Sequence, residues 1–245
     1  MTEGKLYVVG LGPGAYEDMT LRADRALEEC DTIVGYSVYV DLIRDRYPGK
    51  EYATTPMTRE ADRCRMALEA ARAGKTVALV CSGDSGIYGM AALVYALRGE
   101  DTLPEITVIP GLTAACSGGA LLGAPLTHDF CVISLSDRLT PWETIEARLT
   151  AAAAADFSVV LYNPASRGRP EHLRRACEIL LRTLPPERLC GIARSIGRPG
   201  ESREFCTLGE LGTREADMFC TVFIGNSATR LVGGNMLTPR GYRED

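Results

Sequence analysis

With 245 residues and 46% hydrophobic residues, the chain has an ordinary globular composition and is long enough for one large or two small domains. Its formal net charge of −5 argues against a general attraction to nucleic acids or to anionic membrane surfaces. Nine cysteines without a C-x-x-C pair, beside only two histidines, argue against a structural zinc site and a disulfide framework and favour a reducing, cytoplasmic location.

The first predicted elements are a strand, a helix and a second strand. Leu6–Val9 is a short apolar strand, and Glu3 and Lys5 before it do not resemble a signal peptide. Thr20 is the expected N-cap of a helix that runs to Glu29. Thr32–Val34 is the second strand, so the chain begins with strand–helix alternation.

A glycine-rich loop, G-L-G-P-G at 10–14, follows the first strand. It departs from the dinucleotide-binding pattern because Ala15 stands where the last glycine should be. Pro13 also lacks an N–H group with which to hold a pyrophosphate. This loop therefore argues against a Rossmann-type oxidoreductase.

The remaining elements of the first half continue the alternation. The pattern predicts a helix over 40–47, a helix from Glu60 to Ala73 that stops at Gly74, a strand at Thr76–Val80, a helix at Ala91–Leu97 and a strand at Ile106–Ile109. Strands and helices that alternate with short loops predict an α/β fold with a mainly parallel sheet and helices on both faces.

The stretch V-C-S-G-D-S-G-I-Y-G-M at 80–90 joins a buried strand to a helix. Its glycines allow a ligand to approach the main chain, and Asp84 adds a carboxylate. A tight turn capped by Asp84 is the alternative role for this stretch. Ligands of open α/β sheets bind at these carboxyl ends of strands. Pro110–Ser117 then opens a helix of small residues, near which we place the boundary between domains at 1–114 and 115–245.

The second half predicts a sheet of mixed direction. Strands are expected at 130–135, 158–162, 189–195 and 218–224, with a further, antiparallel one at 205–208, and helices at 141–155 and 171–184. His172, at a helix start among arginines, is expected to be solvated.

Five motifs in order resemble the tetrapyrrole methylases. They are G-L-G-P-G at 10–14, S-G-D-S-G-I-Y-G at 82–89, P-G-L-T-A at 110–114, L-Y-N at 161–163 and G-N-S at 225–227. The resemblance implies two α/β domains with S-adenosylmethionine in the cleft between them, a small-molecule tetrapyrrole substrate and a homodimer. A sulfonium donates its methyl group without a metal, so no metal is expected.

Longer stretches resemble one branch of that family, whose members methylate carbon 17 of precorrin-3B or cobalt-precorrin-3 and contract the ring in cobalamin biosynthesis. These stretches are V-G-Y-S-V-Y at 34–39, the run from Leu121 to Asp137, L-T-P-W at 139–142, Y-N-P-A-S-R-G-R at 162–169 and M-L-T-P-R-G-Y at 236–242. The resemblance leaves open whether the natural substrate is metal-free or contains cobalt.

By the same resemblance, nine residues would contact the cofactor: Pro13, Gly83, Asp84, Ile87, Thr113, Ala114, Tyr162, Ala193 and Ser227. A substrate rich in carboxylates needs a basic patch. The candidates are the arginines just beyond predicted strand ends: Arg138, Arg167, Arg169, Arg194 and Arg198. We expect substrate contacts from Tyr36, Arg138, Arg167 and Arg169.

Ring contraction also requires a proton to move, and a neutral imidazole suits general acid–base catalysis near pH 7. His128 is the histidine that lies within a matched stretch, and Asp129 follows it directly. Both are therefore candidates for catalysis, although a structural role for His128 is the alternative. Ser134 and Tyr36 are further candidates for the base.

Three other functions share parts of this pattern. Diphthine synthase and ribosomal RNA ribose methylases would have the same cofactor loops with a different substrate. A non-catalytic ligand-binding module would bind S-adenosylmethionine without turnover. The H-D-F-C-V-I-S-L-S-D stretch at 128–137 and T-P-R-G-Y at 238–242 favour the corrin enzyme.

Overall fold

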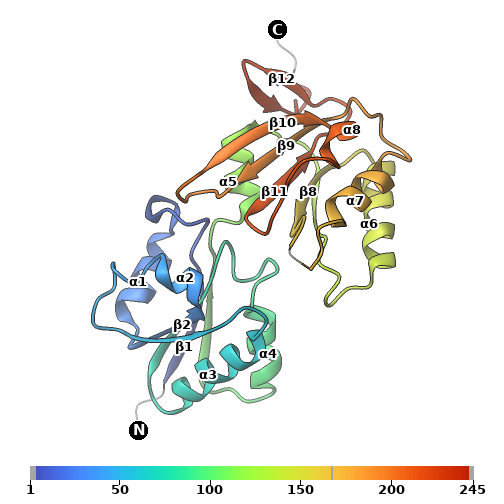
Figure 1. Cartoon of the computed structure of the whole chain (residues 1–245). Coiled ribbons are helices and arrows are strands. Elements are labelled where there is room, and N and C mark those ends of the chain that lie inside the picture. Colours follow the sequence, from blue (N-terminus) through green and yellow to red (C-terminus); the bar gives the residue numbers. More distant parts are fainter. Residues whose placement is uncertain (1–3, 167, 243–245) are drawn as a thin grey trace. The chain divides into compact units, whose positions relative to one another are not determined.

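The computed structural model describes residues 4–166 and 168–242, and the chain divides into two compact units (Figure 1). Unit 1 is Met1–Thr113 and unit 2 is Ala114–Asp245. Each unit is described by itself.

Unit 1 contains a five-stranded sheet in the order β3-β2-β4-β1-β5, in which every neighbouring pair is parallel. Its strands are β1 (Lys5–Gly10), β2 (Thr32–Tyr36), β3 (Glu51–Thr55), β4 (Thr76–Cys81) and β5 (Glu105–Ile109). The helices are η1 (Tyr16–Asp18), α1 (Leu21–Glu29), α2 (Ser37–Asp41), α3 (Glu60–Arg72) and α4 (Ala91–Arg98). The predicted parallel sheet is confirmed.

Two separate cores cover the two faces of this sheet. On one face, alternate residues of β4 such as Val77 and Leu79 pack with α3 and α4. On the other, Ala78 and Val80 pack with α1 and the segment that follows α2. Because both faces are buried, the central strands are continuous apolar runs, which is why the sequence pattern identifies them.

Two elements of unit 1 differ from the prediction. The strand β3 was not predicted, since E-Y-A-T-T lies at the edge of the sheet, is only partly buried and has little apolar content. The helix expected over 40–47 is wrong: α2 ends at Asp41 and turns follow. The turns bring Tyr47 into the core, where its hydroxyl donates a hydrogen bond to Asp24 of α1.

Unit 2 contains a mixed sheet in the order β10-β9-β11-β8-β7 and a small sheet in the order β12-β13-β6. Only β7 and β8 are parallel in the larger sheet. The strands are β6 (Gly123–Ala124), β7 (Phe130–Ser134), β8 (Ser158–Tyr162), β9 (Leu189–Arg194), β10 (Ser202–Thr207), β11 (Cys220–Ile224), β12 (Arg230–Val232) and β13 (Asn235–Leu237). The helices are α5 (Ala114–Leu122), α6 (Trp142–Ala154), α7 (His172–Leu180) and α8 (Leu208–Leu211).

The helices of unit 2 are divided between the two faces of its larger sheet. Residues of α6, α7 and α8 pack with Leu161 and Val222 on one face. On the other face, α5 and Met236 of β13 pack with Phe223. A Cβ atom on Gly118 of α5 would lie 3.0 Å from the ring of Phe223. The small residues of α5 therefore let it lie close to the sheet, as the sequence predicted.

The mixed sheet is confirmed, including the antiparallel strand β10. The helix expected to reach Leu184 ends at Leu180 and continues as turns, and the short strands β12 and β13 were not predicted. Each of these strands has three residues, too few for a recognisable alternation. Within residues 4–166 and 168–242, no helix has the length and apolar character required to cross a membrane.

The packing of Gly10 gives a first testable prediction. A Cβ atom at this position would lie 2.6 Å from both the Gly111 nitrogen and the Gly83 oxygen, which are backbone atoms. Gly10→Ala should therefore destabilise unit 1 by about 1–3 kcal/mol, as overpacking does. Chemical denaturation measures the change. Gly168→Ala is the matched control, because no atom lies within 4 Å of its Cβ position; equal stability of the two variants would contradict the prediction.

Candidate functional site

Three loops follow β1, β4 and β5, which are adjacent parallel strands, so all three lie at the carboxyl edge of the unit 1 sheet. The first two are joined by backbone hydrogen bonds. Gly83 N–H donates to the Gly12 oxygen at 2.7 Å, and Gly12 N–H donates to the Gly83 oxygen at 3.1 Å. Leu11 N–H also donates to the Cys81 oxygen at 2.8 Å, so three backbone hydrogen bonds join these two loops.

Asp84 joins the second loop to the third. Its Oδ1 accepts a hydrogen bond from Gly86 N–H at 2.7 Å, and its Oδ2 accepts one from Gly111 N–H at 2.9 Å. Ser85 is fully buried beside it, with Oγ 3.2 Å from the Val8 oxygen and 3.3 Å from the Ile109 oxygen. Both oxygens of Asp84 thus hold the loops themselves: the Gly86 bond caps its own turn, which was the alternative role, and the Gly111 bond reaches a distant loop that the sequence did not predict.

The glycines of these loops have their backbones in direct contact. A Cβ atom on Gly111 would lie 2.1 Å from the Gly83 oxygen. Ile87 and Tyr88 extend from the second loop with exposed fractions of 41% and 57%. A ligand at this edge would therefore contact main chain and these two side chains, which fits the predicted role of Gly83 and Ile87.

The other predicted contacts of unit 1 lie at the same edge. Pro13 is buried in the first loop, and Thr113 is buried at the end of the third. Tyr36 ends β2 and packs edge-on against Tyr39, with ring centroids 5.2 Å apart. Arg63 of α3 lies 5.8 Å from the centre of the Tyr36 ring and is almost fully buried. The sequence did not indicate that Arg63 is buried beside Tyr36, because it is one of several arginines in the predicted helix.

In unit 2, a row of paired residues crosses the larger sheet. Ser134 of β7 pairs with Tyr162 of β8, and Thr221 of β11 pairs with Ala193 of β9. The register of β8 and β11 places Tyr162 opposite Thr221, so the four residues share one face. The Tyr162 hydroxyl accepts a hydrogen bond from Ala115 N–H at 2.6 Å. This row therefore lies beside the first turn of α5, which begins at the predicted contact Ala114.

Ser227 and His128 lie at the opposite edge of that sheet. Ser227 follows β11, which is antiparallel to β8, and its hydroxyl donates to Asp156 just before β8. His128 precedes β7, six residues before Ser134. At about 3.3 Å per residue, this separation is about 20 Å.

This distance limits which of the predicted residues of one chain can act together. A general base must lie within hydrogen-bond reach of its proton, and the methyl donor must meet the reacting carbon at contact distance. Within one chain, His128 and Asp129 therefore cannot share a reaction centre with Tyr162 and Ala193. Ser227 also lies at the other end of β8 from Tyr162, beside Asp156. The sequence motifs could not show this separation, because they do not specify in which direction each strand runs.

The predicted substrate arginines differ in their surroundings. Arg138 is exposed in the loop after β7. Arg169 donates to Ser136 Oγ at 2.5 Å and to Ser166 Oγ at 3.2 Å, and it lies 3.6 Å from Asp137. Arg167 lies outside the described residues.

His172 is buried rather than solvated, which corrects the prediction. Its Nδ1 lies 2.8 Å from the Leu135 oxygen, and its Nε2 lies 3.4 Å from Asp137 Oδ2. The ring also packs on Trp142 at a centroid distance of 4.8 Å. The Leu135 carbonyl and the Trp142 ring are tertiary contacts, so the local sequence of α7 could not show them.

The nine cysteines are all free, and their environments differ. Burial raises the pKa of Cys30 and Cys81 to about 11 and that of Cys64 and Cys177 to about 12. Cys116, in the first turn of α5, is exposed. Among residues 4–166 and 168–242, no group of three or more His, Cys, Asp or Glu side chains could hold a metal ion.

Removal of the Asp84 carboxylate should loosen two loops at once. Asp84→Ala leaves the N–H groups of Gly86 and Gly111 without their acceptor, and hydrogen bonds to charged groups contribute about 1.5–3 kcal/mol each. Faster amide exchange is expected in both loops, measured by hydrogen exchange with mass spectrometry. Asp101→Ala is the control, since that exposed carboxylate pairs only with Arg72 among the described residues. Unchanged protection around Gly111 would refute the assigned role.

Thiol labelling should identify Cys116 as the fast-reacting cysteine. Thiolate is the reactive form, and burial with a raised pKa suppresses it at sites such as Cys64 and Cys81. At pH 7.5 we expect one fast thiol per chain with a disulfide reagent, and its loss in Cys116→Ser. A fast phase that persists in this variant would contradict the burial assignments.

Comparison with known proteins identifies the family. The family model "Tetrapyrrole (Corrin/Porphyrin) Methylases" matches residues 5–212. A relative in Salmonella typhimurium, named probable cobalt-factor III C(17)-methyltransferase, is 46% identical over 97% of this chain and 99% of its own length. The precorrin-3B C(17)-methyltransferase of a Sinorhizobium species is 40% identical over 98% of this chain and 97% of its own.

Solved structures agree with the sequence comparison. The crystal structure of the methyltransferase CobJ superposes with a TM-score of 0.91 at 40% identity, covering 96% of this chain and all of CobJ. A uroporphyrin-III C-methyltransferase of Thermus thermophilus, complexed with S-adenosylhomocysteine, shares the fold with a TM-score of 0.70 at 22% identity, over 91% of this chain and 92% of its own. The five ordered motifs, the parallel and mixed sheets and these matches agree: the chain belongs to the tetrapyrrole methylase family and is a methyltransferase.

Proposed function

We propose that the chain is an S-adenosylmethionine-dependent methyltransferase of cobalamin biosynthesis that methylates carbon 17 of precorrin-3B, or of its cobalt-containing counterpart, with contraction of the ring. The observation that carries this proposal is full-length similarity to proteins named for C(17) methylation, at 46% and 40% identity. The TM-score of 0.91 with CobJ supports it, because the whole of that methyltransferase is covered.

The loops of unit 1 fit the cofactor's need for main-chain contact. Gly10 and Gly111 have no room for side chains, and Gly83 has a φ of 65° that favours glycine, so a ligand would meet backbone rather than Cβ atoms. Asp84 holds two of these loops in place. S-adenosylmethionine supplies an electrophilic methyl group when bound, and orientation by ordered groups can contribute about 7–11 kcal/mol to such a transfer.

For unit 2, we assign the cofactor contacts to the row that contains Tyr162 and Ala193. Thr221 then takes the place that the sequence gave to Ser227, since it lies opposite both residues and is buried. Tyr162 orients the first turn of α5 by accepting the Ala115 N–H bond. That turn begins at Ala114, directly after Thr113, so it continues from the third glycine loop.

Ring contraction requires a proton to be moved, and Ser134 is the predicted candidate that lies in this row. Its Oγ accepts hydrogen bonds from Asn163 Nδ2 at 2.9 Å and from Ser136 N–H at 3.2 Å. These two hydrogen bonds hold the hydroxyl of Ser134 in a fixed position on the face that it shares with Tyr162. A positioned acid or base contributes typically about 10²–10⁴-fold.

The substrate would carry several carboxylates, for which the edge beyond β7 and β8 offers arginines. Arg169 is held by Ser136, Ser166 and Asp137. An arginine fixed by such contacts has less conformational freedom to lose when it binds a carboxylate. Arg138 is the more exposed candidate at the same edge, and we retain Arg167 and Tyr36 as proposed contacts.

An anaerobic assay of the purified protein tests the proposal. The protein is incubated with S-adenosylmethionine and either precorrin-3B or its cobalt counterpart, and the product is identified by mass spectrometry and absorbance. Methylated, ring-contracted product from one substrate supports the proposal and identifies the metal state. Binding of S-adenosylmethionine without turnover of either substrate would favour the non-catalytic binding module.

The same assay tests whether His128 or Ser134, at opposite edges of the unit 2 sheet, contributes to ring contraction. His128→Ala should methylate and contract at near the parent rate, because His128 lies about 20 Å from the Tyr162 row along the strand. Ser134→Ala should slow contraction more than methylation. A His128 variant that accumulates methylated, uncontracted macrocycle would return the acid–base role to the imidazole.

Loss of the Tyr162 hydroxyl should weaken cofactor binding. Tyr162→Phe removes the acceptor of Ala115 N–H, and an unsatisfied buried group is destabilising by about 1–3 kcal/mol. We expect about tenfold weaker binding of S-adenosylhomocysteine by calorimetry with the fold retained. Tyr95→Phe, on the exposed face of α4, is the control. Equal affinities in the two variants would place the cofactor elsewhere.

We further propose a homodimer located in the cytoplasm. The family resemblance motivates the dimer, and sedimentation at micromolar concentration tests it. Nine unpaired thiols, eight of them with pKa values that burial raises, suit a reducing compartment.

A further inference from the structure

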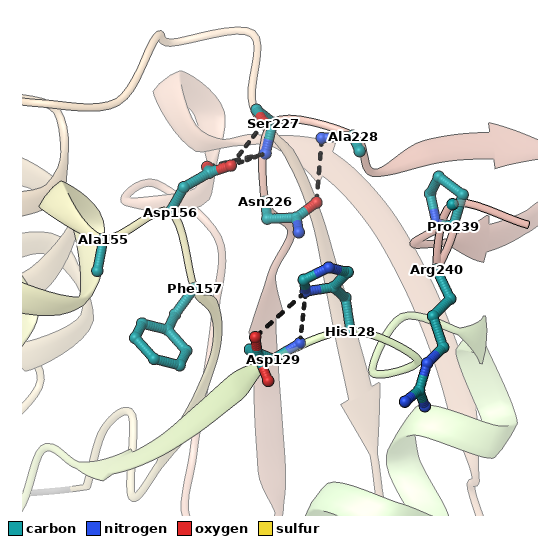
Figure 2. A pocket seen from close by; sticks show the side chains of 11 residues that line it. His128, Asp129, Ala155, Asp156, Phe157, Asn226, Ser227, Ala228, Pro239 and Arg240 are labelled. Carbon is teal, nitrogen blue, oxygen red and sulfur yellow. Dashed lines mark hydrogen bonds and ion pairs between the residues drawn. The ribbon is translucent and has the colours of Figure 1, made fainter.

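A pocket of about 390 Å³ lies at the edge of the unit 2 sheet opposite the Tyr162 row (Figure 2). A second hollow of about 480 Å³ shares His128, Asp129 and Arg240 with it. The two stretches that favoured the corrin enzyme, at 128–137 and 238–242, both contribute lining residues. These stretches are distant in sequence, and the proposed reaction uses neither His128 nor Arg240.

Asn226 directs an unpaired donor toward this pocket. The residue is 93% buried, and its Oδ1 accepts hydrogen bonds from Ala228 N–H at 3.0 Å and Thr229 Oγ at 3.1 Å. Because Ala228 N–H can only donate, the side-chain oxygen must be the atom that meets it. The amide nitrogen therefore faces the other way, and it makes no hydrogen bond within the described protein. Figure 2 shows this nitrogen on the side of His128.

His128 presents a second donor. Its Nδ1 accepts a hydrogen bond from Asp129 N–H at 2.8 Å, which assigns the proton of the neutral ring to Nε2. No group of the described protein accepts a hydrogen bond from Nε2. In Figure 2, Nδ1 faces Asp129 while the rest of the ring lies between Asn226 and Arg240.

Arg240 adds a positive charge to the same lining. Its guanidinium makes no hydrogen bond or ion pair with residues 4–166 or 168–242, although it lines both hollows. Three side chains thus bring donors to one pocket without acceptors for them. Asn226 is buried whereas His128 and Arg240 are exposed, and because buried donors are normally satisfied, an acceptor is the group that Asn226 Nδ2 lacks.

The two carboxylates of the lining are directed to other partners. Burial acts to raise the pKa of Asp156, but hydrogen bonds from Ser227 and Arg188 outweigh it, so the pKa is lowered and the carboxylate stays charged. Its charge is balanced by Arg188 at 3.0 Å. The side chain of Asp129 is 83% exposed and lies on the Nδ1 side of His128, 3.6 Å away. Among the described residues, no hydrogen bond or ion pair joins either carboxylate to His128 Nε2.

We propose that this pocket binds an oxyanion, a carboxylate or a phosphate group, through Asn226 Nδ2, His128 Nε2 and the guanidinium of Arg240. A carboxylate has two acceptor oxygens in one plane, and a phosphate has several in a tetrahedron. An arginine guanidinium can donate two hydrogen bonds to either group. The site is separate from the proposed reaction centre, because His128 lies about 20 Å along the strand from the Tyr162 row.

Nuclear magnetic resonance of the histidine side chains tests the proposal directly. The chain has only two histidines, so the imidazole spectrum contains a reporter, His128, and an internal reference, His172. His172 is buried and contacts Leu135 and Asp137 at the other edge of the sheet. Phosphate and propionate are titrated separately at constant pH and ionic strength, with chloride as the balancing ion.

We expect saturable shifts of the His128 signals with phosphate, propionate or both, while those of His172 stay constant. The titration that saturates shows whether the pocket binds a phosphate or a carboxylate group. Asn226→Asp keeps the acceptor for Ala228 N–H but replaces the free donor with an oxygen, so it should weaken binding at least tenfold. Arg240→Gln should do the same. Arg230→Gln, an exposed arginine of β12 outside the pocket, should bind as the parent does.

The proposal would be overturned if neither anion produced a shift beyond that of chloride. It would equally be overturned if Asn226→Asp and Arg240→Gln bound the anion as tightly as the parent while unfolding at the same temperature. Because the measurement needs neither cofactor nor tetrapyrrole, its outcome is independent of the proposed enzymatic activity.

Discussion

The contact between Asp84 and the backbone of the neighbouring loops is the constraint on which the candidate site depends. One carboxylate accepts hydrogen bonds from Gly86 and Gly111, and thereby joins the loop after β4 to the loop after β5. The loop after β1 joins them through Gly12 and Gly83. These three loops are distant from one another in the sequence. They meet because the strands that precede them, β4, β1 and β5, are adjacent and parallel. Glycines are required because the main chains touch.

Strand direction has the corresponding role in unit 2. Because β11 runs against β8, its end at Ile224 lies beside the start of β8, and its beginning lies beside Tyr162. Residues of the matched motifs are therefore distributed over two edges. Tyr162, Ala193 and Thr221 form one group beside α5, and the pocket around His128 forms another. Two sites with different chemistry are consistent with this separation: a methyl-transfer site at one edge and an oxyanion pocket at the other.

Both histidines illustrate how a tertiary contact changes the interpretation of a residue. His128 lies in a matched motif, which made it the natural candidate for acid–base catalysis, yet it precedes β7, whose far end carries the Ser134 that pairs with Tyr162. His172 lies among arginines at a helix start, which suggested a solvated residue, yet Trp142 and the Leu135 carbonyl enclose it. In each case the local sequence was interpreted correctly as helix or strand, and the distant partner decided the role.

The sequence by itself determined the family, the α/β class and the order of the glycine loops, because ordered motifs and buried parallel strands leave strong local patterns. It also located most helices and central strands, but not β3, β12 or β13, which are edge or three-residue strands with little apolar alternation. Only the tertiary structure decided that Asp84 bonds its own loops and that Thr221, not Ser227, lies beside Tyr162. Hydrogen-bond partners and strand register depend on residues far apart in the chain, so no local pattern encodes them.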